Sequence, residues 1–270
     1  MTQQNFFLKI LENLVRSNIY FFIFSRFITN LLFSKYIYET DFKILKILKN
    51  YHYFDNLKKP IIDIGANDGI SYKTIRNFLC KTSIISFEPL KNNFKKLKNL
   101  KNKDKNYKIH NCGLSNIKIK KKLYIPYFKE YPLSSFAGID KISIISRLKI
   151  SLFNKNLLRK IIFKSEDIKL KKLDDFNLNP SFIKIDIEGH EYECIMGALK
   201  TIKKNKPILL IEYDRNTNKK INKILKKINY KSYYYDNKIN YIKLHNKEKI
   251  FNIIYIPENI INVKKNNDYN

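Results

Sequence analysis

The ten residues Ile61–Ile70 constrain the fold of this chain more than any other stretch. A short apolar run rich in β-branched residues carries Asp63 near its end, and a loop with glycines at 65 and 69 follows at once. The helical pattern of Tyr72 to Leu79 comes next. This order predicts a buried parallel strand, a tight loop and a helix whose N-terminus faces a ligand. Because such an N-terminus is partly positive and Asp63 is negative, the loop suits a ligand that carries both charges.

From Pro60 onward, apolar runs of strand length alternate with helical patterns, as is typical of an α/β protein. We expect closing strands with antiparallel edges near the C-terminus. The expected strands are Ile61–Ile64, Ser83–Phe87, Tyr107–His110, an exposed Lys118–Ile125, Ile168–Leu173, Ser181–Ile187, Pro207–Ile211, Lys231–Tyr235, Tyr241–Leu244 and Phe251–Ile256. The expected helices are one that ends near Cys80, Asn92–Leu100, Glu191–Ile202 and Asn216–Ile228.

The alternating pattern defines a main domain over residues 60–256. Within it, residues 127–165 follow no clear pattern, and we expect them to form a lid over a site, with a basic helical piece around Arg147–Phe163. Residues 1–59 are expected to form an N-terminal helical extension. Residues 257–270 are polar and are expected to form a frayed tail.

The N-terminal extension contains a very aromatic stretch, Ile19–Phe33. Polar residues interrupt it, and it is shorter than the ~20 apolar residues that span a bilayer. No basic segment precedes it and no small-residue cleavage site follows, so we predict no signal peptide. We expect this helix to pack against the main domain, and the alternative is an interfacial helix that contacts a membrane or a partner. Thr40-Asp41 then caps a helix that carries Phe42, Leu45 and Leu48.

The formal net charge is +29, but only six of the 53 basic residues are arginine. Nucleic-acid sites favour arginine for bidentate contacts to phosphates and guanine, so we expect no dedicated nucleic-acid surface. Attraction to anionic surfaces, such as lipid headgroups or acidic glycans, remains reasonable. The three cysteines, Cys80, Cys112 and Cys194, form no metal or disulfide pattern, which favours a reducing compartment such as the cytoplasm.

Polar residues stand at the ends of several expected strands, where ligands bind in a doubly wound sheet. They are Asp63, Glu88, Asn111, Cys112, Asp186 and Glu188. Glu88 follows Gly69 by about 20 residues, the spacing of an acid that binds ribose hydroxyls. A carboxylate accepts hydrogen bonds from both hydroxyls of a ribose, and the alternative is a capping acid before Pro89.

Asp186 and Glu188 close the apolar strand Ser181–Ile187. Because side chains alternate along a strand, Lys184, Asp186 and Glu188 share a face if the extended conformation persists. Buried charges are costly unless they are paired, so we expect a polar cluster at this strand tip. A purely structural Lys184–Asp186 pair is one alternative, and a Mg²⁺ site on the acids is another. We assign no metal to the chain.

Four blocks of sequence, in this order, resemble the FkbM family of S-adenosylmethionine-dependent methyltransferases. They are Asp63–Gly69, Phe87-Glu88-Pro89, Leu173-Asp174-Asp175 and, the most specific, Ile183-Lys184-Ile185-Asp186-Ile187-Glu188-Gly189-His190-Glu191. The resemblance runs from about residue 60 to 215. It covers neither residues 1–59 nor residues 136–165.

The resemblance implies a Rossmann-like class I methyltransferase fold, with a mostly parallel twisted sheet, helices on both faces and an antiparallel edge. It implies S-adenosyl-L-methionine as the cofactor and O-methyl transfer to a hydroxyl of a sugar, polysaccharide or glycolipid, with acceptor specificity in residues 127–165. By position, the cofactor's methionine portion would lie against Asp63, Gly65, Ala66, Asn67 and Gly69, its ribose against Glu88, its adenine beside Asn111, Cys112 and Gly113, and its reacting end against Asp186 and Glu188.

An alcohol acceptor loses a proton on methylation, so a base helps by roughly 10²–10⁴. The candidates are Asp186, Glu188 and His190, although His190 could equally be a surface cap residue of the helix that it opens. Two rival functions remain: an RNA or other nucleic-acid methyltransferase, favoured only by the charge, and a non-enzymatic binder of lipid or glycan surfaces. Nothing in the sequence indicates the oligomeric state.

Overall fold

The computed structural model of the protein describes residues 42–48, 59–151, 158–214, 217–236, 241–244 and 252–260. The expectations for residues 1–41 and for most of the tail therefore lie outside the described residues. The chain divides into two compact units. The described part of the smaller unit belongs to residues 122–166, and that of the larger unit to residues 39–121 and 167–270.

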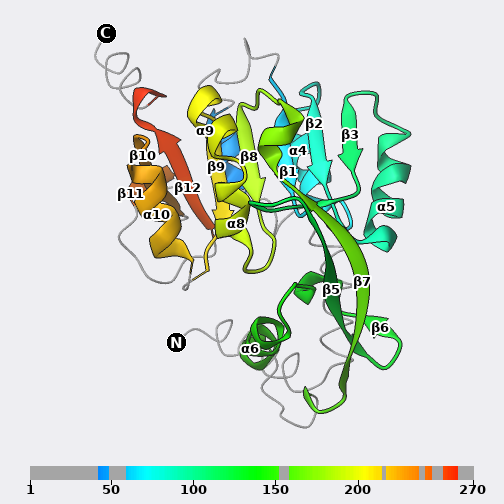
Figure 1. Ribbon diagram of the computed structural model, residues 1–270. Coiled ribbons are helices and arrows are strands. Elements are labelled where there is room, and N and C mark those ends of the chain that lie inside the picture. The colour runs from blue at the N-terminus through cyan, green and yellow to red at the C-terminus, as the bar shows by residue number, and fades with distance from the viewer. Residues whose placement is uncertain are drawn as a thin grey trace, which may run out of the picture. The chain divides into compact units, whose positions relative to one another are not determined.

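The larger unit is built on an eight-stranded sheet with the order β11-β10-β12-β9-β8-β1-β2-β3 (Figure 1). Neighbours from β3 to β9 run parallel, whereas β12 is antiparallel to both β9 and β10, and β11 is antiparallel to β10. The strands are β1 (Ile61–Ile64), β2 (Ile84–Phe87), β3 (Tyr107–His110), β8 (Phe182–Ile185), β9 (Ile208–Glu212), β10 (Tyr230–Asp236), β11 (Tyr241–Leu244) and β12 (Asn252–Pro257).

Helices cover both faces of this sheet, because alternate residues of its parallel strands point to opposite sides. Ile62 and Ile64 of β1 belong to one core cluster, together with residues of α8, α9 and α10. Ile61 belongs to a second cluster, together with residues of α4 and of the helical segment 42–48. The helices of this unit are α4 (Ile70–Phe78), α5 (Lys91–Lys101), the 3₁₀ turn η3 (Leu173–Phe176), α8 (Glu191–Met196), α9 (Leu199–Asn205) and α10 (Asn218–Lys226).

The strand order reverses at β1, which lies between β2 on one side and β8 on the other. Ile64, the last residue of β1, is level with Phe87 of β2 and with Ile185 of β8. The residues that follow these three strands therefore emerge at one edge of the sheet. In open α/β sheets this is the position of ligand sites.

Some sequence-based expectations are wrong in detail. The strand expected over Ile168–Leu173 begins earlier, at Ile161, and ends at Lys171. The single helix expected over Glu191–Ile202 is split into α8 and α9 at Gly197. The carbonyl of Gly197 accepts a hydrogen bond from the Asp174 N–H, and a Cβ atom on Gly197 would lie 1.9 Å from the Ser115 carbonyl oxygen. A backbone packed this closely interrupts the regular helix. The strand expected over Ser181–Ile187 ends at Ile185.

The smaller unit contains α6 (Lys141–Ser151), the 3₁₀ turn η2 (Ser134–Phe136) and β6 (Tyr131–Pro132). The long strands β5 (Ile119–Phe128) and β7 (Ile161–Lys171) carry the chain into and out of it, in a sheet with the order β4-β7-β5-β6, where β4 is Gly113–Leu114. The helix expected around Arg147–Phe163 is wrong at its C-terminal end, because α6 ends at Ser151 and β7 begins at Ile161. Among the described residues, no helix is long and apolar enough to cross a membrane.

Candidate active site

The loop after β1 depends on residues with positive φ. Gly65, Asn67 and Gly69 have φ values of 80°, 49° and 90°. A Cβ atom on Gly65 would lie 1.9 Å from the carbonyl oxygen of Asp186, so the loop passes directly against the chain that leaves β8. Only glycine tolerates both this close contact with another backbone and a positive φ. Helix α4 then begins at Ile70, with Gly69 as its N-cap residue.

Glu88 follows β2 and holds the glycine loop. Its Oε2 accepts a hydrogen bond from the Asn67 N–H (2.8 Å), and its Oε1 accepts one from the Leu90 N–H (2.9 Å). The side chain of Asn93 extends this network by donating to Asn67 Oδ1 (2.8 Å). Glu88 is 4% exposed, and burial raises the pKa of its carboxyl group to about 7 despite these hydrogen bonds. Each carboxylate oxygen has a second lone pair with which to bind a ligand hydroxyl.

The residues after β3 lie beside Glu88. Asn111 donates from Nδ2 to the carbonyl oxygens of Glu88 and Pro89, both at 3.0 Å. Cys112 is buried in the core, and burial raises the pKa of its thiol to about 11, so it remains a neutral, packed thiol. Gly113 begins β4.

Asp63 lies beneath the loop, and none of its side chain is exposed. Its Oδ2 accepts hydrogen bonds from the hydroxyls of Ser71 and Ser86. Its Oδ1 accepts no hydrogen bond from the described residues but lies 3.5 Å from Lys184 Nζ. This residue therefore connects β1 to α4, β2 and β8 from inside the protein.

Lys184 joins Asp63 to the exposed end of the site. Its Nζ lies 3.2 Å from Asp186 Oδ2 and donates a hydrogen bond of 3.3 Å to the Gly65 carbonyl oxygen. Burial alone would lower the pKa of this amine, but the Asp186 and Asp63 carboxylates outweigh burial and raise it. The Lys184–Asp186 pair considered from the sequence is thus present, and it also fixes the glycine loop.

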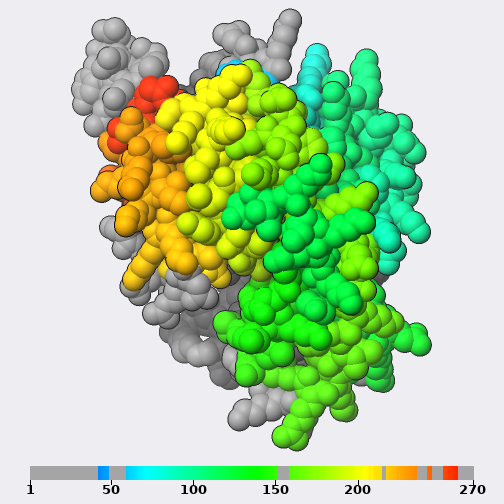
Figure 2. Space-filling view, viewed as in Figure 1, coloured from blue at the N-terminus to red at the C-terminus, as the bar shows by residue number. Residues whose placement is uncertain are grey.

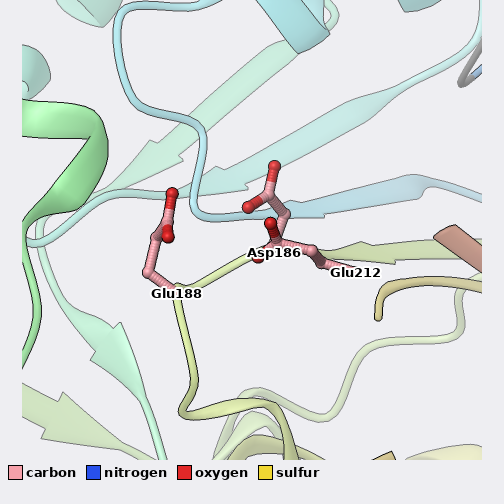
Figure 3. A group of neighbouring side chains, drawn as sticks. All are labelled: Asp186, Glu188 and Glu212. Carbon is pink, nitrogen blue, oxygen red and sulfur yellow. The ribbon is translucent and has the colours of Figure 1, made fainter. Parts of the chain in front are cut away.

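Three carboxylates meet where β8 and β9 end (Figure 3). One oxygen each of Asp186, Glu188 and Glu212 lies within 4.8 Å of the others. The explanation based on strand alternation is wrong for Glu188, because β8 has already ended and Glu188 has a φ of 59°. Burial and the neighbouring Asp186 and Glu188 raise the pKa of Glu212 to about 10. Oxygen ligands of this kind could also hold a hard cation such as Mg²⁺.

Glu212 is the site residue that the sequence analysis missed. It ends β9, in which Ile211 is level with Ile185 of β8. The signal was present, since Glu212 follows the apolar run Pro207–Ile211 much as Asp186 follows its own strand.

His190 and Glu191 open α8 and have different surroundings. Glu191 Oε1 accepts hydrogen bonds from the N–H groups of Ile187 and Gly189 (both 3.1 Å), and burial raises the pKa of this carboxyl group to about 7. Glu191 therefore supports the loop that carries Glu188. His190 lies between Ser115 Oγ (3.0 Å from Nε2) and a Glu193 carboxylate oxygen (3.5 Å from Nδ1). Burial lowers the pKa of His190, which favours the neutral imidazole.

The architecture is that of a Rossmann-like class I methyltransferase, with a glycine loop and strand-end acids at its switch point. Residues 63–235 match the methyltransferase FkbM domain, and the chain belongs to this family. No curated protein matches the chain.

Several solved structures resemble the chain, and three methyltransferases are among them. An FkbM methyltransferase from Methylobacillus flagellatus KT has 19% identity and a TM-score of 0.46, over 73% of this chain and 43% of that chain. This chain thus spans less than half the length of that protein. A precorrin-6y C5,15-methyltransferase from Geobacter metallireducens GS-15 has 10% identity and a TM-score of 0.39, over 74% and 80% of the two chains. A putative RNA methyltransferase from Pyrococcus horikoshii has 11% identity and a TM-score of 0.34, over 80% of this chain and 81% of that chain.

Proposed function

We propose that this protein is an S-adenosylmethionine-dependent O-methyltransferase that methylates a hydroxyl of a sugar, in a polysaccharide or a glycolipid. The observation that carries the proposal is the Glu88 carboxylate at the end of β2, hydrogen-bonded to the glycine loop of β1 through Asn67. This pairing of a loop with an acid suits a nucleoside whose ribose hydroxyls donate to the acid. Membership of a methyltransferase family supports a methyl donor as that nucleoside.

The residues present fit this cofactor. The glycine at position 65, where a Cβ atom would meet Asp186, lets the loop assigned to the methionine portion lie directly against the residues assigned to the reacting end. We assign the methionine portion to the loop residues Gly65, Ala66, Asn67 and Gly69, and the ribose to Glu88. Asn111, Cys112 and Gly113 would lie beside the adenine, with Cys112 contributing backbone atoms because its side chain is buried. Asp63, which has no exposed side-chain surface, would act indirectly by fixing the loop and Lys184.

Asp186 and Glu188 would line the reacting end. The bound cofactor supplies an activated sulfonium methyl group. The methyl group would pass to the acceptor hydroxyl oxygen, the sulfonium would leave as a neutral thioether, and the hydroxyl proton would pass to a base. We assign that base to Asp186 or Glu188 first, because both ring nitrogens of His190 already contact Ser115 and Glu193. Alignment of donor and acceptor can supply about 7–11 kcal/mol in favourable cases.

The cofactor assignment is tested by calorimetric titration with S-adenosylhomocysteine. We expect the wild-type protein to bind it and Glu88→Ala to weaken binding at least about tenfold, because a charge-assisted hydrogen bond contributes about 1.5–3 kcal/mol. Glu130→Ala, which removes an exposed acid of the smaller unit, is the matched control. Unchanged binding in Glu88→Ala would remove the ribose assignment.

The acceptor class is tested by incubating the protein with cofactor carrying a labelled methyl group and with separate polysaccharide, lipid and RNA fractions of the source cell. Label in polysaccharide or glycolipid supports the proposal. Label in RNA would replace it with a nucleic-acid methyltransferase, and steep salt dependence of RNA binding would accompany that result. Absence of transfer to every fraction would favour a non-enzymatic binder.

We assign no metal to this reaction, although Asp186, Glu188 and Glu212 offer oxygen ligands. Methyl transfer that survives extensive treatment with EDTA supports this assignment. Activity that is lost with EDTA and restored by Mg²⁺ would overturn it.

We also propose that the protein works in the cytoplasm. The exposed Cys80 and the buried Cys112 and Cys194 are all free thiols in the structure, as suits a reducing compartment. The predicted helices of residues 1–59, with their alternative contact to a membrane surface, lie outside the described residues except for residues 42–48 and 59. Fractionation of source cells, with the protein followed in soluble and membrane fractions, tests both assignments.

A further inference from the structure

Helix α6 of the smaller unit has apolar side chains on two sides. Ile144 and Leu148 point inward and are fully buried against Phe128, Leu133 and Phe136. These contacts account for one face of the helix. They leave the opposite face to be explained.

The outer face of α6 also carries isoleucines. Ile142 is 76% exposed, Ile145 is 37% exposed and Ile150 is 73% exposed. At 100° per residue, Ile145 and Ile150 lie on either side of Ile142, about 60° and about 80° from it around the helix axis. Side chains of this helix are visible at the molecular surface in Figure 2. Exposed aliphatic side chains that gather on one face mark a surface that contacts a partner or a membrane.

Two lysines accompany these isoleucines. Lys141 and Lys149 are exposed at the two ends of α6. Lys141 Nζ also lies 5.7 Å from the ring centroid of Phe163, which places the start of β7 beside the start of the helix. There Lys164 is exposed, and so is Ile162 at 52%. The neighbouring strand thus also exposes one isoleucine and one lysine.

The acidic residue that is adjacent to α6 in the chain is engaged by the helix itself. Asp140 precedes α6 and accepts hydrogen bonds from the N–H groups of Ile142 (3.3 Å) and Ser143 (2.7 Å). It acts as a cap, and its charge is directed toward the positive helix N-terminus. The outer face therefore presents aliphatic side chains and positive charge.

We propose that the outer face of α6, formed by Ile142, Ile145 and Ile150 together with Lys141 and Lys149, docks on a membrane surface rich in anionic lipid. Aliphatic side chains enter the boundary of the acyl chains, while lysines lie at the headgroups with their stems along the helix. The charge of the whole chain, +29, adds long-range attraction to such a surface.

A membrane fits this face better than a nucleic acid does. Nucleic-acid sites combine arginine with aromatic stacking, whereas this face offers isoleucine and lysine. The proposal is independent of the proposed function, because none of its residues belongs to the candidate active site.

The chain contains no tryptophan, so one introduced tryptophan reports on one position. We would compare Ile142→Trp with Ile117→Trp, whose site on the larger unit is 45% exposed. With vesicles of phosphatidylcholine and phosphatidylglycerol, we expect the emission of Ile142→Trp to shift to the blue and that of Ile117→Trp to stay unchanged. An unshifted emission from Ile142→Trp, or equal shifts in both variants, would overturn the proposal.

Co-sedimentation with the same vesicles gives a second measurement. We expect the double variant Ile142→Ser/Ile150→Ser to bind at least about tenfold more weakly than the wild type, since it removes two aliphatic side chains from the contact. Ile117→Ser/Ile119→Ser, on exposed positions, should bind like the wild type. If the Ile142→Ser/Ile150→Ser variant binds the vesicles as strongly as the wild type does, the proposal is contradicted.

Light scattering of the wild-type protein without vesicles tests whether a second copy of the chain, in place of a membrane, binds this face. A dimer that the Ile142→Ser/Ile150→Ser variant abolishes would assign this face to a second copy and overturn the membrane proposal. A calorimetric titration with S-adenosylhomocysteine should give the same affinity in both double variants. This separates failure of docking from failure of the proposed function.

Discussion

The Oε2 atom of Glu88 accepts a 2.8 Å hydrogen bond from the backbone N–H of Asn67, and this bond joins the end of β2 to the loop after β1. Asn67 can present its N–H because its backbone has a positive φ, between two glycines that also do. Glu88 thus fixes the shape of the loop and still has lone pairs for a ligand. Its protonation state should control what the loop binds.

The affinity for S-adenosylhomocysteine should rise with pH through neutrality. Burial raises the pKa of Glu88 to about 7, so the carboxyl group is largely protonated below this pH and ionised above it. If ribose hydroxyls donate to the ionised form, affinity should increase about tenfold between about pH 6 and about pH 8 and then level off. Calorimetry over this range measures the change. In Glu88→Gln the profile should flatten, and a variant that keeps the wild-type slope would assign the titration to another group.

Gly65→Ala should strongly destabilise the protein. The substitution places a Cβ atom 1.9 Å from the Asp186 carbonyl oxygen at a residue with a φ of 80°. The strained conformation alone costs about 1–3 kcal/mol, and the backbone overlap adds to it. Gly138→Ala is the control, because its Cβ would meet only side-chain atoms of Arg147 and Ile144, at 3.2 Å or more. Urea unfolding should show a much larger loss for Gly65→Ala, and equal losses would refute this account of the loop.

Lys184→Met should cost roughly 3–5 kcal/mol of unfolding free energy, because it leaves a buried carboxylate without its cation. Asp63 has no exposed side-chain surface, and Lys184 is 3.5 Å from it. The double variant Asp63→Asn/Lys184→Met should recover part of the loss, since the uncompensated charge is then removed. Lys73→Met on the exposed side of α4 provides the control for loss of a lysine. A double variant less stable than Lys184→Met would argue against the pairing.

Glu212→Gln should stabilise the protein at neutral and alkaline pH. Burial and two neighbouring carboxylates raise the pKa of Glu212 to about 10 in the folded state. An acid with a raised folded-state pKa costs no stability below its unfolded value near ~4.5, and the cost grows as pH rises from there toward the folded value. Glutamine resembles the protonated acid, so the variant should gain roughly 1–3 kcal/mol over the wild type at about pH 8 and nothing at about pH 4.

Unfolding free energies of Glu212→Gln at several pH values measure this difference. Glu130→Gln, an exposed substitution, should follow the wild type throughout. A difference that does not grow with pH would show that Glu212 ionises freely in the cluster.

Much of the fold could be predicted because local signals agreed with it. The β-branched residues and glycines of residues 61–69 predict a strand and a glycine loop, and the strand is Ile61–Ile64 in the structure. Tyr107–His110 and Tyr241–Leu244 match their expected bounds. The smaller unit was the least predictable. Helix α6 has isoleucines on both its buried and its exposed face, so its sequence lacks the single apolar face by which an amphipathic helix is predicted.

The sequence by itself determined the order of strands and helices, the glycine loop, and the positions of Glu88, Asp186 and Glu188 at strand ends. Only the tertiary structure decided which charged side chains lie close enough to interact. Pairing of β8 with β9 brings Glu212 to Asp186, and pairing of β1 with β8 sets Asp63 against Lys184. These contacts join residues far apart in the chain, and electrostatic interactions depend on distance and burial, which no local pattern encodes.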